Sequence, residues 1–226
     1  AGDDVDANVT NSSRTNSPPV IGLMGSIGAG KSTVAQMLLD AGCIVSDSDA
    51  LAREAFKDPA VREEIVKWWG ASILDPQGII DRSRVATKIF PAVSASDIDR
   101  ATADRERKRL EALVHPWIHV RRRALFAQAP ATAKALVIDA PLLLESNMQG
   151  ECDALIMVDA PFSVRFERVR TSRGWTSDEL TRRENSQMPL DLKRKLAHHI
   201  VNNDGNIESL RAQVAQILRI ISQHHS

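Results

Sequence analysis

A glycine-rich stretch of eight residues restricts the possible folds of this chain more than any other feature. Residues 25–32 read GSIGAGKS and match the pattern G-x-x-x-x-G-K-[ST]. The apolar run 20–24 precedes the stretch, and residues 31–41 repeat apolar side chains at helical spacing up to Gly42, which is placed to end the helix. A strand, a glycine-rich turn and a helix in this order predict a phosphate-binding loop, or P-loop, at the start of an α/β domain.

The loop contains the groups that a nucleotide triphosphate and its metal require. Glycines allow backbone conformations in which N–H groups converge on phosphate oxygens. Lys31 is predicted to reach the β- and γ-phosphates, and the Ser32 hydroxyl to ligate Mg²⁺, so ATP and Mg²⁺ are the expected cofactors. The residues predicted to bind the nucleotide here are Gly25, Ile27, Gly28, Ala29, Gly30, Lys31 and Ser32.

Four more short apolar runs predict the rest of a parallel sheet. They are residues 43–45, 135–138, 154–158 and, as the weakest candidate, 199–201. Runs that are apolar throughout are typical of strands covered on both faces, and the apolar residues of 207–223 share one helical face. The predicted fold is therefore a P-loop NTPase-type three-layer sandwich, with a five-stranded parallel sheet and helices on both faces.

The remaining segments predict two helical additions to this core. Residues 56–133 have helical periodicity and many charges but no clear strand, which predicts a helical substrate domain. The expected organisation is a disordered tail at 1–17, a core made of 18–55, 134–160 and 196–226, the substrate domain at 56–133, and a lid at 161–195.

Composition excludes several classes of partner. The chain has 29 basic and 29 acidic residues, so a nucleic-acid coat is not expected, and it has no apolar run long enough to span a membrane. Two cysteines, Cys43 and Cys152, are interpreted as structural thiols in a reducing compartment, and no signal peptide is recognised. The expectation is a cytoplasmic monomer or weak homo-oligomer that binds small molecules.

Carboxylates follow two of the predicted strands. Asp47 and Asp49 come after the second strand, where an extended chain would point both to the same side. One could act as general base and the other could orient Mg²⁺ through water, or one could cap a helix starting near Ala50. Asp139 ends the third strand, where it would serve as a Mg²⁺-water ligand or as a loop or cap residue.

The lid segment is strongly basic. Residues 162–195 hold nine basic side chains against five acidic ones, and Phe162, Phe166 and Val169 share one helical face. The arginines are therefore expected largely on the exposed face, either simply solvated or available to a transferring phosphate. Gly174 could break the chain between two helical arms.

Taken together, local signatures in this order resemble the dephospho-CoA kinase family from about residue 20 to residue 217. Besides the P-loop they comprise 47–54 (DSDALARE), 81–82 with Phe90, 113–118 (LVHPWI), 141–145 (PLLLE), 187–189 (QMP), Lys193, and Asn203 with Gly205. The resemblance implies ATP-dependent phosphorylation of the ribose 3′-hydroxyl of dephospho-CoA, which gives coenzyme A and ADP. It adds Thr33 and Asn203 to the nucleotide-binding set.

The same resemblance implies roles for individual residues. Asp49 would be the base toward the 3′-hydroxyl, and Arg173 the lid arginine, with Arg170 in reserve. The residues expected to bind substrate are Asp47, Arg82, His115, Pro141, Leu142 and Leu143. Without the resemblance, His115-Pro116 would be interpreted as the kink or start of a helix.

The lid departs from the family pattern at two places. The family usually has Arg-Asp where this chain has Arg173-Gly174, and an aliphatic residue where this chain has Glu184. Two rival hypotheses remain open: a nucleoside-monophosphate or other metabolite kinase of the same fold, and a nucleotide-dependent switch without an acceptor.

Overall fold

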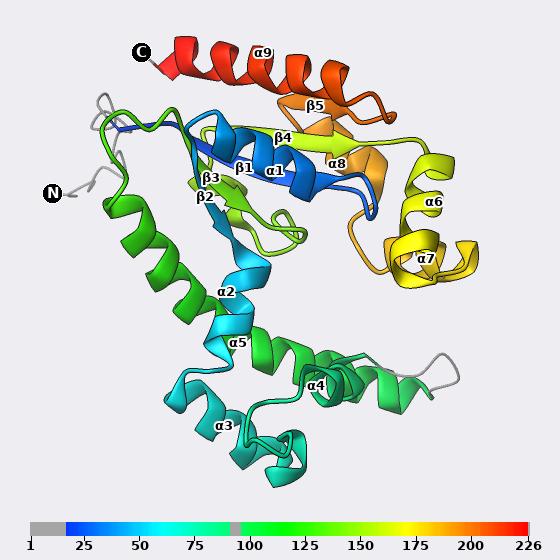
Figure 1. Cartoon of the computed structure of the whole chain (residues 1–226). Helices are drawn as coiled ribbons and strands as arrows, with labels where there is room; N and C mark the ends of the chain where they lie inside the picture. Colours follow the sequence, from blue (N-terminus) through cyan, green and yellow to red (C-terminus); the bar gives the residue numbers. More distant parts are fainter. Residues whose placement is uncertain (1–16, 91–95, 226) are drawn as a thin grey trace, which may run out of the picture. The chain divides into compact units, whose positions relative to one another are not determined.

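A computed structural model describes residues 17–90 and 96–225 of the chain. The chain forms two compact units, shown in Figure 1. One contains the described residues up to Val45 and from Ala129 onward, and the other comprises Ser46–Gln128. The tail predicted to be disordered lies outside the described residues, apart from Ser17.

The first unit is built on a five-stranded parallel sheet with the strand order β2-β3-β1-β4-β5. The strands are β1 (Val20–Gly25), β2 (Ile44–Asp47), β3 (Leu136–Asp139), β4 (Ala154–Asp159) and β5 (His199–Asn202). All five form where the sequence predicts them, including the weakest. Strand β1 lies between β3 and β4, so the glycine-rich loop leaves the middle of the sheet.

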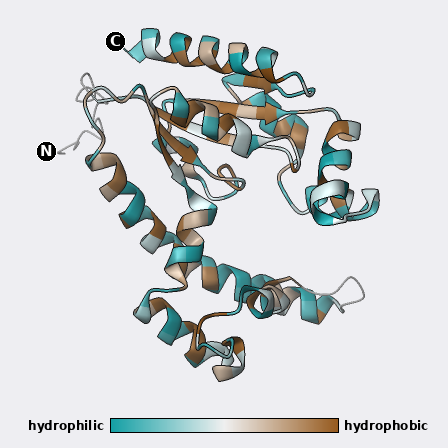
Figure 2. Cartoon of the chain, in the orientation of Figure 1, coloured by the Kyte–Doolittle hydropathy of each residue, from teal (hydrophilic) through white to brown (hydrophobic). Residues whose placement is uncertain are grey.

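Helices α1 (Lys31–Asp40) and α9 (Ile207–His225) cover one face of this sheet. Their apolar stripes pack on inward-facing strand residues, which Figure 2 shows as brown ribbon. Helix α1 ends at Asp40 with Ala41 as its C-cap, and Gly42 follows with a φ of 95°, which permits the turn in which Cys43 N–H bonds to Leu38 O at 3.0 Å. The expected helix end at this glycine is confirmed.

The opposite face is covered by the segment after β3 and by α8 (Leu190–Leu196). A Cβ on Gly22 of β1 would meet Leu155, Leu143 and Cys152 within 2.9 Å, so this face is closely packed. A short helix, η2 (Met148–Glu151), leads back into β4. Helices on both faces give the predicted three layers.

Besides α8 up to Lys195, the segment predicted as a lid contains two helices that follow β4. They are α6 (Phe162–Arg173) and α7 (Ser177–Asn185). Gly174 adopts a left-handed conformation, with φ 68°, as the C-cap of α6. The predicted break between two arms is thus confirmed.

The second unit is helical, and its bounds, Ser46–Gln128, differ from the predicted 56–133 because α2 (Ser48–Ala55) belongs to it. It also contains α3 (Pro59–Trp69), the short helix η1 (Ala71–Ile73), α4 (Arg82–Ile89) and α5 (Asp97–Ala127). Its core gathers around α5 and consists of Ala55, Val61, Ile65, Ile73, Ile80, Val85, Leu110, Val114 and Ile118. Pro116 lies inside α5, so His115-Pro116 does not start a helix.

Within the described ranges, no helix combines the length and the apolar character that a membrane crossing demands.

Candidate active site

The glycine-rich loop presents several unpaired backbone donors. Gly28 and Gly30 have φ values of 76° and 89°, which favour glycine. In the described part of the chain, the N–H groups of Gly28, Gly30, Lys31 and Ser32 donate to no protein oxygen. Helix α1 begins at Lys31, so the positive end of its dipole lies at the same place. Converging free N–H groups at a helix N-terminus bind phosphate oxygens.

Lys31 is paired with the carboxylate at the end of the neighbouring strand. Its ammonium group forms an ion pair with Asp139, whose side chain is only 7% exposed. Asp139 was predicted either to orient Mg²⁺ or to serve as a loop residue, and its pairing with the loop lysine places it beside the P-loop. Phosphoryl transfer requires a mobile cation and a carboxylate near the triphosphate, and this pair contains both.

Residues behind the loop hold its carbonyl groups. Asn203, predicted to bind the nucleotide, donates from Nδ2 to Ala29 O at 2.7 Å. Arg168 of α6 donates to Gly28 O at 3.3 Å and to Ala29 O at 3.2 Å, and Arg165 to Ile27 O at 3.4 Å. These contacts surround the loop on the side opposite its free N–H groups.

The expectation that the lid arginines lie largely on an exposed face is wrong for Arg165. Its side chain is buried, at 5% exposure, and Lys193 of α8 is buried as well. Helical spacing carries the missed signal, because Arg165 lies three residues after Phe162 and four before Val169, on their face.

Asp47 ends β2, whereas Asp49 already lies in α2, so the two aspartates do not share an extended strand. The chain enters α2 at Ser48, so Asp47 is the N-cap and accepts a bond from Ala50 N–H at 2.9 Å. Asp49 lies in the first helical turn, exposed. Capping by one of the pair, the alternative reading, is therefore confirmed for Asp47, and the prediction that alternation points both to one side is wrong.

The other predicted substrate residues lie in different surroundings. Arg82 is the exposed first residue of α4, and His115 is exposed on α5. Leu142 is 40% exposed and Pro141 half-buried, whereas Leu143 is fully buried beneath β1. A contact between each of these side chains and a substrate stays a prediction.

The candidate lid arginines differ in their partners. Arg170 is paired with Glu167 at 2.7 Å on the surface of α6. Arg173 lies over the ring of Trp175 at 4.8 Å, and Arg183 lies over the same ring at 4.3 Å. Within the described residues Arg173 has no carboxylate at ion-pair distance.

A second buried contact joins the segment after β3 to the end of the lid. Glu145 pairs with Lys193 at 2.9 Å and accepts a bond from Met188 N–H at 2.9 Å. Burial alone would raise the pKa of Glu145, but the bonds from Met188 and Lys193 outweigh it and hold the pKa below its ordinary value. The Pro-Leu-Leu segment and the Gln-Met-Pro segment, both singled out by sequence, thus meet at one carboxylate.

The loop also suits a magnesium ion bound together with a nucleotide. The Ser32 hydroxyl is exposed at the start of α1, and Asp139 at the end of β3 has a carboxylate next to Lys31, so both residues have oxygen atoms of the kind that Mg²⁺ prefers. In the ranges that the structure covers, no three His, Cys, Asp or Glu side chains gather closely enough to hold a metal by themselves. Mg²⁺ in nucleotide sites needs only one or two protein ligands, because phosphates and water complete its shell.

The parallel sheet, the glycine-rich loop with its free donors and the helical arms after β4 define a P-loop kinase fold. The model of the dephospho-CoA kinase family matches residues 19–209. The chain belongs to this family.

Individual relatives agree with the assignment. A dephospho-CoA kinase of Thermobifida fusca is 38% identical over 199 residues, which are 87% of this chain and 93% of that protein. The crystal structure of TT1252 from Thermus thermophilus has a TM-score of 0.75 at 31% identity and covers 90% of this chain and 98% of that one. Dephospho-CoA kinase from Campylobacter jejuni shares the fold, with a TM-score of 0.58, 19% identity and coverage of 91% and 98%.

Proposed function

We propose that this chain transfers the γ-phosphoryl group of ATP to the ribose 3′-hydroxyl of dephospho-CoA, giving coenzyme A and ADP. The observation that carries the proposal is the set of free N–H groups at Gly28, Gly30, Lys31 and Ser32, beside the Lys31–Asp139 pair, in a member of the dephospho-CoA kinase family. Such donors bind a triphosphate, and membership of the family indicates dephospho-CoA as the acceptor.

The P-loop would hold and neutralise the phosphates. Its N–H groups bind phosphate oxygens, and Lys31, released from Asp139, moves to the β- and γ-phosphates. Mg²⁺, held by Ser32 and assisted by Asp139, would supply charge neutralisation of the transferring group. Positioning and charge stabilisation are the main contributions of a protein to this reaction.

Asp49 would accept the proton of the attacking hydroxyl. Its carboxylate is exposed at the first turn of α2, and among the described residues it has no hydrogen-bond or ion-pair partner. A carboxylate that is free of protein partners keeps its acceptor capacity for a substrate. Asp47, committed to the helix cap, is less available for this step.

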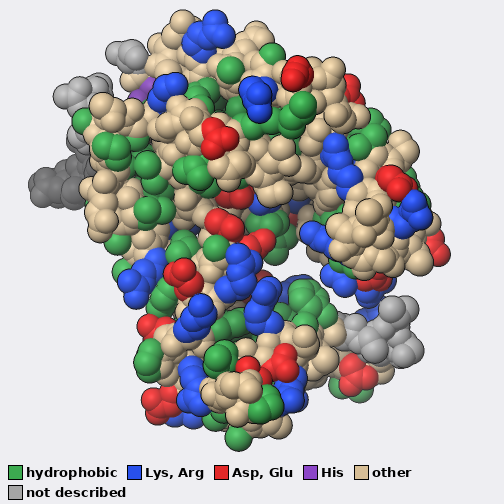
Figure 3. Space-filling view, viewed as in Figure 1, with side chains coloured by type: hydrophobic (Ala, Val, Ile, Leu, Met, Phe, Trp, Pro, Cys, Tyr) green, Lys and Arg blue, Asp and Glu red, His purple; other side chains and the backbone are tan. Residues whose placement is uncertain are grey.

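The acceptor and the lid complete the proposed site. Arg82 and His115 would offer polar contacts to dephospho-CoA, and Pro141, Leu142 and Leu143 are the other residues proposed to bind it. Arg173 would stabilise the charge that develops on the transferred phosphoryl group. On the face drawn in Figure 3, Lys and Arg lie among Asp and Glu, which fits a small-molecule partner better than a nucleic acid. A cytoplasmic protein, monomeric or weakly self-associating, is the proposed setting.

A coupled assay of ADP release with and without dephospho-CoA tests the function. We expect ADP to form at a rate that depends on dephospho-CoA, and the product to carry a new 3′-phosphate by mass spectrometry. A panel of nucleoside monophosphates serves as the alternative acceptors. Phosphorylation of these but not of dephospho-CoA would refute the substrate, and slow hydrolysis with no phosphorylated product would indicate a nucleotide switch.

A further inference from the structure

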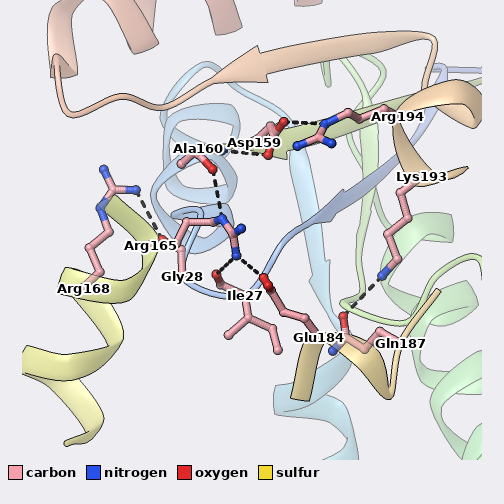
Figure 4. A network of polar contacts seen from close by, with 10 residues as sticks. All are labelled: Ile27, Gly28, Asp159, Ala160, Arg165, Arg168, Glu184, Gln187, Lys193 and Arg194. Carbon is pink, nitrogen blue, oxygen red and sulfur yellow. Dashed lines mark hydrogen bonds and ion pairs between the residues drawn. The ribbon is translucent and has the colours of Figure 1, made fainter. Parts of the chain in front are cut away.

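Helix α6 binds the carbonyl side of the P-loop through two arginines, which lie about one turn apart. Arg168 reaches Gly28 O and Ala29 O, and Arg165 reaches Ile27 O while its Nε donates to Ala160 O at 2.9 Å. Figure 4 shows Arg165 between the loop and α7, and Arg168 beside Gly28. The helix backbone is close as well, since a Cβ on Gly28 would lie 2.8 Å from Arg165 O.

These contacts determine where the loop donors point. A trans peptide unit is planar, and its C=O and N–H point in opposite directions. The bond from Arg165 to Ile27 O therefore fixes the Gly28 N–H, and the bonds from Arg168 and Asn203 to Ala29 O fix the Gly30 N–H. Both N–H groups belong to the donors that have no acceptor in the described protein.

The charge of Arg165 is balanced from the other arm of the lid. Glu184, near the end of α7, forms an ion pair with Arg165, and their side chains are 5% and 15% exposed. A buried ion pair adds little net stability over an apolar pair, because both groups lose their hydration. Its presence here therefore calls for another role, and Glu184 is also one of the positions at which the lid departs from the family pattern.

We propose that Arg165 is a positioning residue for the nucleotide, which orients the Gly28 N–H through the Ile27 carbonyl, and that Glu184 couples the α7 arm to this loop. The inference rests on the proposed function, because it takes the loop as the ATP site. Affinity for ATP then depends on an ion pair that lies behind the loop and touches no substrate.

The sharpest test replaces the pair by an apolar one. Arg165→Met combined with Glu184→Met removes both charges together, so the thermal unfolding midpoint is expected to stay within a few degrees of the unmodified chain. The Ile27 carbonyl loses its donor all the same. We expect the dissociation constant for ATP, measured by calorimetry, to rise about tenfold. The KM for dephospho-CoA should change less than about twofold, since the acceptor site is untouched.

Two further variants separate positioning from packing. Arg165→Lys keeps a charge for Glu184 but lacks the planar fork that serves two carbonyls, so ATP affinity should fall by an intermediate factor. Exchange of the two residues, Arg165→Glu with Glu184→Arg, restores an ion pair without a donor at position 165. This exchange should recover folding relative to Arg165→Glu alone, but not ATP affinity.

A matched control lies on the same helix as Glu184. Glu179 pairs with Arg182 at 2.8 Å and with Arg183 at 2.6 Å, away from the loop. Glu179→Gln should leave ATP affinity unchanged.

The inference would be overturned if the Met–Met variant or the exchanged variant bound ATP as tightly as the unmodified chain. If the Met–Met variant fails to fold, the ATP affinity of Arg165→Lys decides. ATP binding without phosphorylation of dephospho-CoA would sink the proposed function alone, whereas absence of ATP binding in the unmodified chain would sink both.

Discussion

Asp49 is the residue on which the chemistry of the proposed reaction depends most. Asp49→Asn keeps the shape of the side chain but removes its ability to accept a proton. We expect the turnover number to fall by roughly 10² to 10⁴ while ATP affinity stays nearly unchanged. Steady-state kinetics together with ATP calorimetry measures the two effects separately.

Asp97 provides the control for this substitution. It is likewise an exposed aspartate in the first turn of a helix in the second unit. Asp97→Asn should therefore leave turnover unchanged. Near-normal turnover of Asp49→Asn would remove Asp49 from the role of base.

Gly30 tests the loop itself. Its φ of 89° is unfavourable for other residues, and a Cβ would collide with the amide of Asn203, which holds the loop carbonyl. Gly30→Ala should weaken ATP binding by at least about tenfold, because the loop must shift and its N–H groups diverge. Gly150→Ala, whose Cβ meets nothing within 4 Å, is the control, and equal affinities in the two variants would contradict the geometry.

Among the interactions between elements, the contact of α8 with the segment after β3 can be tested by substitution. Lys193 is 1% exposed, and its ammonium group binds Glu145 and the Gln187 side chain. Lys193→Met should lower the free energy of unfolding by about 2–3 kcal/mol, because it leaves the Glu145 carboxylate without its cation. Urea unfolding at pH 7 measures the loss.

A second substitution distinguishes an unpaired charge from lost packing. Adding Glu145→Leu to Lys193→Met removes the uncompensated carboxylate, so part of the lost stability should return. If the double variant is as unstable as the sum of the single variants, the two side chains do not interact energetically.

The stability of the whole molecule should decrease in acid for a reason that can be traced to the same carboxylate. The pKa of Glu145 is lower in the folded than in the unfolded chain, so the folded state binds fewer protons than the unfolded state. Its stabilising contribution is present above the ordinary pKa of 4.5 and is lost as the pH falls through the lower folded value. Unfolding midpoints measured from pH 7 to pH 3 should fall less steeply in Glu145→Gln than in the unmodified chain.

The reactivity of the Cys43 thiol tests whether the core of the first unit is closed. Cys43 is 1% exposed, and burial raises its pKa to about 11. A thiol reagent at pH 8 should therefore leave Cys43 unmodified in the folded chain and react with it only after denaturation. Rapid labelling of Cys43 under native conditions would contradict the packing of α1 on the sheet.

Local patterns were sufficient for much of this molecule. A strand that is covered on both faces is apolar at every position, so each of the five strands could be predicted from its own segment. Gly42 and Gly174 indicate helix ends because glycine readily adopts the positive φ found there. The P-loop was predictable for the same reason, because its glycines, lysine and serine are contiguous. The exact start of α2 was not predicted. The alternative with an aspartate cap placed the start near Ala50, and the helix begins at Ser48, because residues 46–49 fit either conformation and the cap at Asp47 decides between them.

The sequence by itself determined where the five strands lie along the chain, the nucleotide loop and the family, since each depends on neighbouring residues. Only the tertiary structure decided which distant groups meet: Lys31 with Asp139, Arg165 with the Ile27 carbonyl and Glu184, and Glu145 with Lys193. These contacts join residues far apart along the chain, and the type of a charged residue does not indicate whether its side chain is solvated or buried. Its burial and its partner depend on how the sheet and the lid helices pack.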